Sequence, residues 1–224
     1  MPRPQSVDPA HILDRAADLF EQHGYEGVTT QAVARAAGVS EGALFRYFSS
    51  KEQLFTAALM VRAGGPGYFA ALQALITGPT ALPPLVEGLE RASRTAMAFY
   101  GKAVRAITVL AARQGSLPPA PAQFHDHGQR PGPAAAHRTM AEYLRRLQER
   151  GEVQPGDAGA RAAHFLSGLF GYAFAAIMLA GRSDDASWLP EADAFRRQFV
   201  EDFVRGIAVP AGADAQAPHS DRGA

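Results

Sequence analysis

AGVSEGALFRYFSSKEQLF, residues 37–55, joins a tight turn to a short helix and to the start of a longer one. Gly38 lies where two helices have to come close together, and Ser40 is placed to cap the helix that follows. We expect this helix to cover about residues 41–48, which is too short for a helix to be stable alone. Its role must therefore lie in the side chains that it presents.

Two overlapping capping boxes follow the short helix. Ser49 lies three residues before Glu52, and Ser50 lies three residues before Gln53. This spacing is typical of the first turn of a helix, so a long helix is predicted to begin near residue 50. The glycine-rich run RAGGPG at 62–67 is expected to break it.

Two more helices are predicted before the quoted stretch. The Asp8–Pro9 pair supplies a cap and a first helical residue, and apolar residues then recur at helical spacing over 9–23. Thr29 or Thr30 is expected to cap a short helix that begins near Gln31. This short helix, the turn and the next short helix together have the pattern of a helix-turn-helix.

The run VTTQAVARAAGVSEGALFRYFSSKEQLF, residues 28–55, closely resembles the N-terminal DNA-binding signature of the TetR/AcrR family of bacterial transcriptional regulators. The resemblance implies an all-α protein. It places a three-helix, helix-turn-helix DNA-binding domain at 1–50 and a helical effector-binding and dimerisation domain at 51–208, with the helix from about residue 50 as connector. Residues 209–224 lack aromatic side chains and are expected to be disordered.

Five residues of this signature are candidates for direct DNA contact. Gly42 leaves room for the helix to approach a groove closely. Phe45 matches an aromatic position of the family, which implies contact with a thymine methyl or a sugar; packing in the core is the alternative. Arg46, Tyr47 and Lys51 match family positions that donate to phosphates.

The starts of the helices add further candidates. Thr29, Thr30 and Ser40 lie where free backbone amides favour a phosphate. Glu41 either accepts from a cytosine amino group or complements the helix dipole. Residues 1–62 hold six cations and seven carboxylates, a net charge of minus one. Binding to DNA must therefore use a few placed donors rather than bulk charge.

Composition limits the remaining possibilities. The 224 residues are 47% hydrophobic, with 22 Lys and Arg balancing 22 Asp and Glu. There is no cysteine, which excludes disulfides, thiolate metal sites and cysteine nucleophiles. The first residues, MPRPQSVDPAH, lack the apolar segment of a secretory signal, so we expect a cytoplasmic protein.

The segment 162–180 is almost wholly apolar and has the length of a short membrane span. Its many small residues suit close helix packing better than contact with lipid, so a buried helix is the preferred interpretation and no membrane partner is expected. Ser167, Gly171 and Ala175 recur every four residues and form a smooth stripe for another helix.

The second half of the chain is expected to be helical. A helix of about seven turns begins at Leu85, and others follow at about 134–150, 158–180 and 190–207. Residues 115–133 are too rich in proline and glycine for regular structure and are interpreted as a long loop.

The last two of these helices are predicted to form a homodimer. Two helices from each subunit make a four-helix bundle, as the family layout also implies. The alternative is that both are ordinary core helices. A dimer suits a palindromic DNA operator, because two short helices related by a dyad read two half-sites. The predicted contacts are the small-residue stripe at 167, 171 and 175 together with Phe195, Phe199 and Phe203.

A small-molecule effector is the remaining expected partner. The helices of the second domain enclose a cavity in the family layout, and a mainly apolar lining favours an apolar or aromatic effector that releases a repressor from DNA. Residues of these types on such helices are more often simply part of the core. The candidates are Met97, Tyr100, Met140, Tyr143, Phe165 and Leu169.

His125 and His127 raise one competing function, a metal-dependent hydrolase or other helical enzyme. Two histidines one residue apart in a proline-rich loop are a weak motif, and no His-Glu-x-x-His pattern supports them. We therefore predict a regulator, with no enzymatic activity, no metal and no cofactor.

Overall fold

The computed structural model describes residues 8–78, 82–114, 133–180 and 187–210, and every extended regular element among them is a helix. The all-α prediction is confirmed. The helices are α1 Pro9–His23, α2 Thr30–Ala36, α3 Glu41–Phe45, α4 Lys51–Arg62, α5 Gly65–Thr77, α6 Leu85–Gln114, α8 Pro133–Glu149, α9 Ala158–Met178 and α10 Ala192–Ile207.

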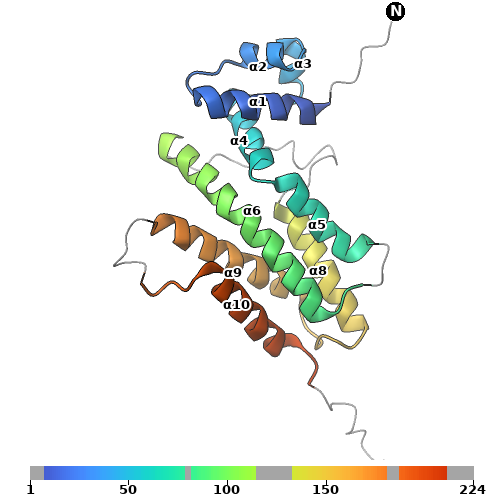
Figure 1. The fold of residues 1–224 in the computed structure, drawn as a ribbon. Coiled ribbons are helices and arrows are strands. Elements are labelled where there is room, and N and C mark those ends of the chain that lie inside the picture. The colour runs from blue at the N-terminus through green and yellow to red at the C-terminus, as the bar shows by residue number, and fades with distance from the viewer. Residues whose placement is uncertain (1–7, 79–81, 115–132, 181–186, 211–224) are drawn as a thin grey trace, which may run out of the picture.

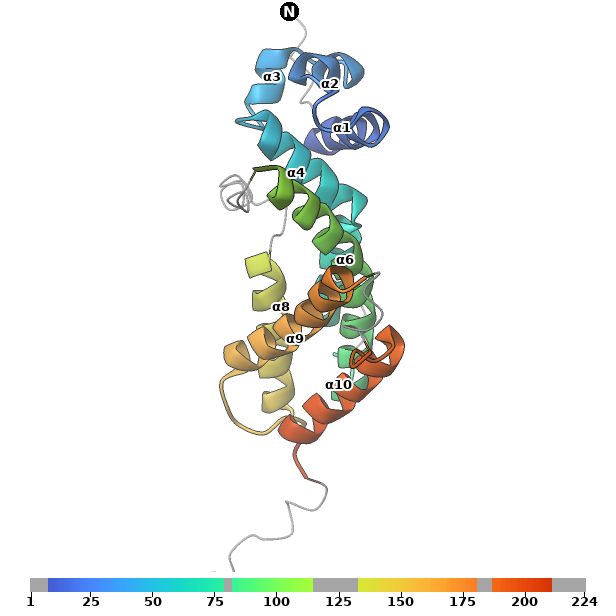
Figure 2. The ribbon, with the colours of Figure 1, turned by 90° about the vertical axis from the view of Figure 1, so that its left-hand side faces the viewer.

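The helices gather around two hydrophobic cores. Helices α1–α3 lie at one end of the molecule and α5–α10 at the other, with α4 running from the first group into the second (Figures 1 and 2). Leu13, Leu44 and Leu54 are fully buried in the smaller core, and Leu89 and Phe165 in the larger one. The division at residue 50 into two domains stays a prediction, because α4 contributes to both cores.

The short helix of the opening stretch ends earlier than predicted. α3 stops at Phe45 rather than near residue 48. The amides of Tyr47 and Phe48 both donate to the carbonyl of Leu44 at 3.0 Å, so the last turn tightens. Phe48 is thereby buried in the smaller core, and the backbone becomes extended at Ser50, which caps α4.

Helix α5 was not predicted, because RAGGPG at 62–67 was interpreted only as a break. Gly64 takes the left-handed conformation at φ +85° and turns the chain, after which a helix resumes at once. Pro66 is tolerated because it lies in the first turn, where an amide has no partner within the helix. Tyr68 and Leu72 of α5 are then buried in the larger core.

A close approach between α6 and α8 requires a glycine. The fully buried hydroxyl of Tyr143 on α8 donates toward the carbonyls of Pro83 and Pro84, at 3.1 and 3.0 Å. Burial raises the pKa of Tyr143 above its ordinary value, so the hydroxyl keeps its proton. A Cβ atom at Gly88 would lie 1.9 Å from this hydroxyl oxygen.

Helix α10 is joined to α6 by a buried charge. Arg196 is only 6% exposed, and its Nη1 donates to Glu90 Oε2 at 2.5 Å and to Ser93 Oγ at 3.3 Å. Asp193 on the same helix lies 3.5 Å from its Nε. A buried guanidinium needs such partners, because an unpaired charge is costly to remove from water.

We predict that Gly88→Ala lowers the free energy of unfolding by about 1–3 kcal/mol, because the new methyl group overlaps the buried Tyr143 ring. Gly101→Ala in the same helix is the control. Its Cβ meets nothing within 4 Å, so it should stabilise the helix by about 0.5–1 kcal/mol. Urea denaturation measures both; equal effects of the two substitutions would contradict the contact.

Candidate nucleic-acid interface

The starts of α2, α3 and α4 are each capped by a side-chain oxygen. Thr29, Ser40 and Ser50 accept from the backbone amide three residues further on, at 3.1, 3.1 and 3.2 Å. These caps fix where each short helix begins, because the first amides of a helix have no partner inside it. The cap predicted at Ser40 is confirmed, and of the alternatives that the sequence left open Thr29 caps α2 and Ser50 caps α4.

The turn between α2 and α3 has the geometry of a helix-turn-helix. Gly38 adopts φ +68°, and the amide of Val39 donates to the carbonyl of Ala34 at 2.9 Å. Ala34 and Leu44 are buried in the smaller core and Val39 packs against it, so apolar contacts fill the inside of the turn. The turn therefore holds α3 at a fixed angle to α2.

The outer face of α3 is open to solvent. Glu41, Gly42, Phe45 and Arg46 are all exposed, and Phe45 is 44% exposed. A side chain at Gly42 would meet nothing within 4 Å, so the glycine is not required by packing. The exposure of Phe45 does not support the alternative that its ring packs in the core. Glu41 accepts from the hydroxyl of Thr30 at 2.5 Å, which joins the starts of α2 and α3.

Lys51 is held at the start of α4 by an aromatic ring. Its Nζ lies 4.3 Å from the ring centroid of Tyr25, and the Tyr25 hydroxyl donates to Glu52 Oε1 at 2.5 Å. That hydrogen bond lowers the pKa of Glu52, and burial raises the pKa of Tyr25. Tyr47, another predicted phosphate contact, is half-buried and packs against the smaller core.

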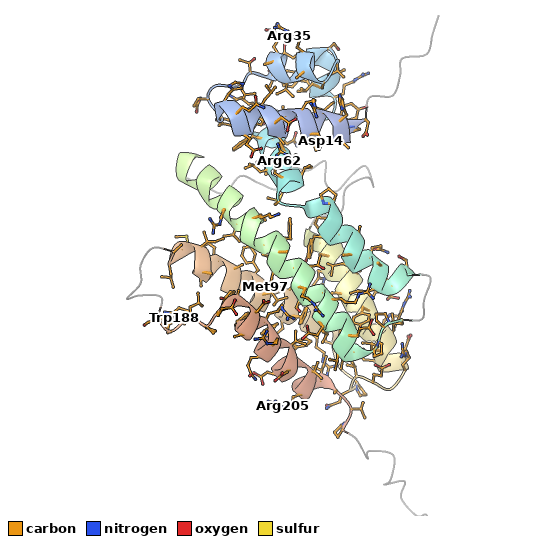
Figure 3. The ribbon with its side chains drawn as sticks, viewed as in Figure 1. Asp14, Arg35, Arg62, Met97, Trp188 and Arg205 are labelled. Atoms are coloured by element: carbon orange, nitrogen blue, oxygen red, sulfur yellow. The ribbon has the colours of Figure 1, made fainter. Side chains whose placement is uncertain are left out.

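The charges of the first helices are divided between two faces. Arg62 pairs with Asp18 at 2.6 Å and with Glu21 at 2.7 Å, on the side that faces the rest of the molecule. Arg35 and Arg46 have no ion-pair partner within the part of the chain that the structure describes. Figure 3 shows Arg35 at the outer end, far from Arg62. Although residues 1–62 have a net negative charge, Arg35 and Arg46 remain unpaired within the described residues. Arg35 is therefore a candidate for contact with DNA that the sequence prediction omitted.

The six predicted effector contacts all belong to the larger core. Met140, Tyr143, Phe165 and Leu169 have no exposed surface, whereas Met97 and Tyr100 are partly buried. The hydroxyl of Tyr100 lies 3.0 Å from that of Tyr68, so both hydroxyls are satisfied inside the protein. Contact with an effector stays a prediction for all six residues.

The outer face of α9 is apolar and uncovered in the single chain. Phe170, Phe174 and Met178 are 40%, 44% and 52% exposed. They flank the predicted small-residue stripe, in which Ser167 and Gly171 are exposed and Ala175 is half-buried. The sequence prediction named the stripe and missed the large side chains beside it.

The α10 phenylalanines mostly face their own chain. Phe203 is 8% exposed and its ring centroid lies 5.0 Å from that of Phe165. Phe195 and Phe199 are half-buried, and Phe195 stacks on Tyr172 at 4.2 Å. Little of Phe203 is left for a second subunit, although a dimer role for these residues stays a prediction.

Two other sequence predictions concern metals and membranes. His125 and His127 lie outside the described residues. Within the described ranges, no group of three or more His, Asp or Glu side chains is placed to hold a metal ion. None of the described helices combines the length and apolar character that crossing a membrane requires.

The capped helix starts, the fixed turn and the open face of α3 define a helix-turn-helix protein with a larger helical domain. A model described as bacterial regulatory proteins, tetR family, matches residues 12–58. A second, described as AefR-like transcriptional repressor, C-terminal domain, matches residues 87–205, more than half of the chain. The chain belongs to the tetR family of bacterial regulatory proteins, a family of transcription factors rather than enzymes.

Individual relatives agree with this assignment. The chain is 44% identical over 52 residues to the mycofactocin biosynthesis transcriptional regulator MftR of Mycobacterium tuberculosis, which covers 23% of this chain and 26% of that protein. The chain thus spans about a quarter of the length of the first curated relatives it matches.

Two solved structures share the fold. A TetR-family regulator from Mesorhizobium loti MAFF303099 has a TM-score of 0.58 at 21% identity, over 89% of this chain and 96% of that one. The regulator FadR of Bacillus subtilis, in complex with stearoyl-CoA, has a TM-score of 0.56 at 17% identity, over 89% and 100%.

We predict that Tyr25→Phe destabilises the smaller core by at most about 1 kcal/mol at pH 7, since Glu52 is exposed. Glu52 has a lowered pKa in the folded state, so this stabilisation is present above its unfolded pKa and is lost as the pH falls through the folded pKa. The difference from the parent protein, measured by urea denaturation, should shrink when the pH is lowered from 7 to well below the ordinary pKa of a glutamate, about 4.3.

Tyr172→Phe is the matched control for this pH dependence. Its hydroxyl donates to the carbonyl of Pro190 at 2.7 Å, a group that does not titrate, so its deficit should persist in acid. A Tyr25→Phe deficit that is the same at both pH values would show that Glu52 does not carry the interaction.

Proposed function

We propose that this chain is a homodimeric transcriptional repressor, which binds a palindromic DNA operator in the cytoplasm and releases it when a small, mainly apolar effector binds. The observation that carries this proposal is the open face of α3. Gly42, Phe45 and Arg46 are exposed on a helix whose other side is anchored in the core by Leu44. A helix of this kind suits insertion in the major groove.

Each exposed group has a role in the proposed complex. Gly42 lets the backbone of α3 approach the base edges, and the ring of Phe45 contacts a thymine methyl. Arg46 donates to phosphates, which position the helix without carrying sequence information. The capped starts of α2 and α4 add backbone amides, and Lys51 adds a cation at the second of them.

Dimerisation through α9 supports binding to two half-sites. The exposed Phe170, Phe174 and Met178 lie along one outer face of this helix, with the small residues beside them. Burying such a face against its symmetric copy removes apolar surface from water and makes an isologous contact. Two α3 helices related by a dyad then require an inverted repeat spaced by about one or more helical turns.

An apolar effector suits the composition of the larger core. Its buried residues are mostly aliphatic and aromatic, with tyrosine hydroxyls that can orient a polar group. The structural neighbour FadR was solved with stearoyl-CoA, a ligand with a long apolar chain. An effector that binds preferentially to a conformation in which the two α3 helices are wrongly spaced for the operator must weaken DNA binding. DNA must then weaken the binding of the effector by the same factor.

We predict that Gly42→Leu abolishes operator binding, because the new side chain holds α3 away from the base edges. Specific affinity should fall toward the non-specific level, a loss of about a thousandfold or more. Operators are first selected from random DNA with the parent protein, and affinity is then measured by fluorescence anisotropy.

Gly67→Leu is the control, since this exposed glycine of α5 also has nothing within 4 Å of its Cβ position. It should bind the selected operator normally. Circular dichroism establishes that both variants remain folded. Normal operator binding by Gly42→Leu would refute the groove assignment.

We predict that Phe174→Glu converts the dimer to monomers, because it places a charge in an apolar seam. Phe174 is 44% exposed in the single chain, so the fold should survive. Sedimentation velocity measures the change. Gln198→Glu, on the exposed polar face of α10, should leave the dimer intact, and an unchanged dimer in Phe174→Glu would remove α9 as the interface.

A further inference from the structure

A cleft of about 490 Å³ lies between α1, α4 and α6. Its described lining comes from α1 and the turn after it, from α4, and from the second half of α6. Helices α4 and α6 pack together there, and Figure 3 shows Arg62 at the junction below α1. The volume lies in the range of small-molecule sites. None of the six predicted effector contacts lines it.

The floor of this junction cleft is aromatic. The rings of Phe20 and Phe55 lie 4.7 Å apart and edge to face, and Tyr25 lies 5.0 Å from Phe55. Phe20 and Phe55 are buried, so packing in the smaller core fixes the positions of their rings. An apolar or aromatic group in the cleft would therefore meet a preformed surface.

The rim of the cleft is cationic. Arg62, Lys102 and Arg105 line it, against the single carboxylate of Glu21. Arg62 is already paired with Glu21 at 2.7 Å and with Asp18 at 2.6 Å, so it adds no net positive charge. Lys102 is exposed and forms no ion pair with any residue that the structure describes. An aromatic floor beside the exposed ammonium group of Lys102 matches a ligand with one apolar part and one negative group.

We infer that the junction cleft binds a small amphipathic organic anion, with its apolar part on Phe20, Tyr25 and Phe55 and its carboxylate or sulfonate near Lys102. This site is distinct from the effector contacts proposed in the larger core. It joins α6 of the larger domain to α1 and α4, so an occupant contacts both parts of the molecule at once.

Tyr25 connects the cleft to the proposed DNA contacts. Tyr25 lines the cleft, its ring centroid lies 4.3 Å from Lys51 Nζ, and its hydroxyl donates to Glu52. Displacement of the ring by a ligand would move a proposed phosphate donor. This link rests on the proposed function, whereas binding in the cleft does not.

The test uses two fluorescent probes of nearly the same shape. 8-Anilinonaphthalene-1-sulfonate carries a negative charge, and N-phenyl-1-naphthylamine lacks it. Both are titrated into the full-length protein. We expect Lys102→Glu to weaken binding of the sulfonate about tenfold, the effect of losing one charge-assisted contact, with little change for the neutral probe. Arg91→Glu, an exposed charge reversal on the same helix outside the cleft, should change neither affinity.

Unchanged sulfonate affinity in Lys102→Glu, or an equal loss for both probes, would overturn the anion site. Operator DNA provides a separate test of the link through Tyr25. Saturating operator should lower the affinity for the sulfonate. If the operator binds and that affinity stays the same, the link is wrong while the site remains. If no operator is found, the proposed function fails and the probe titrations still decide the site.

Discussion

Helix α4 is twelve residues long and contributes apolar side chains to both hydrophobic cores. Leu54, Phe55 and Ala58 pack in the core of α1–α3, whereas Met60 and the C-cap Ala63 pack in the larger one. Apolar side chains must therefore point in different directions along one short helix, and its apolar surface is not confined to a single stripe. Any rotation of α4 that suits one core disturbs the other, which makes the two cores mechanically dependent.

The local elements were predictable because caps and helical spacing act over a few residues. The starts of α1, α2, α3 and α4 follow from an aspartate, a threonine and two serines, and the packing of Leu44 follows from the turn. Two errors have local causes as well. The predicted break at 62–67 does end α4, but a new helix, α5, begins directly after Gly64. The burial of Phe48 goes with an end of α3 at Phe45 rather than near residue 48.

The surfaces depended on packing between distant residues and were harder to predict. Whether Phe45 faced the core could not be decided until α2 and α4 were placed around Leu44. The exposure of Phe170 and Phe174 follows from which side of α9 meets α6 and α8, and the sequence offers apolar residues on nearly every side. The junction cleft brings Tyr25 to Lys102, positions with no local pattern in common.

The buried Arg196 has a consequence for how the larger domain can move. Apolar side chains can slide past one another at modest cost, but the guanidinium meets Glu90 and Ser93 in one register only. A shift of α10 by one turn would separate the buried guanidinium from Glu90 and Ser93 and leave only Asp193 of its own helix beside it, at the cost of several kcal/mol. We therefore expect α6 and α10 to shift together rather than past one another. Any deformation of this domain has to be absorbed at apolar contacts elsewhere, such as those of α5 with α6.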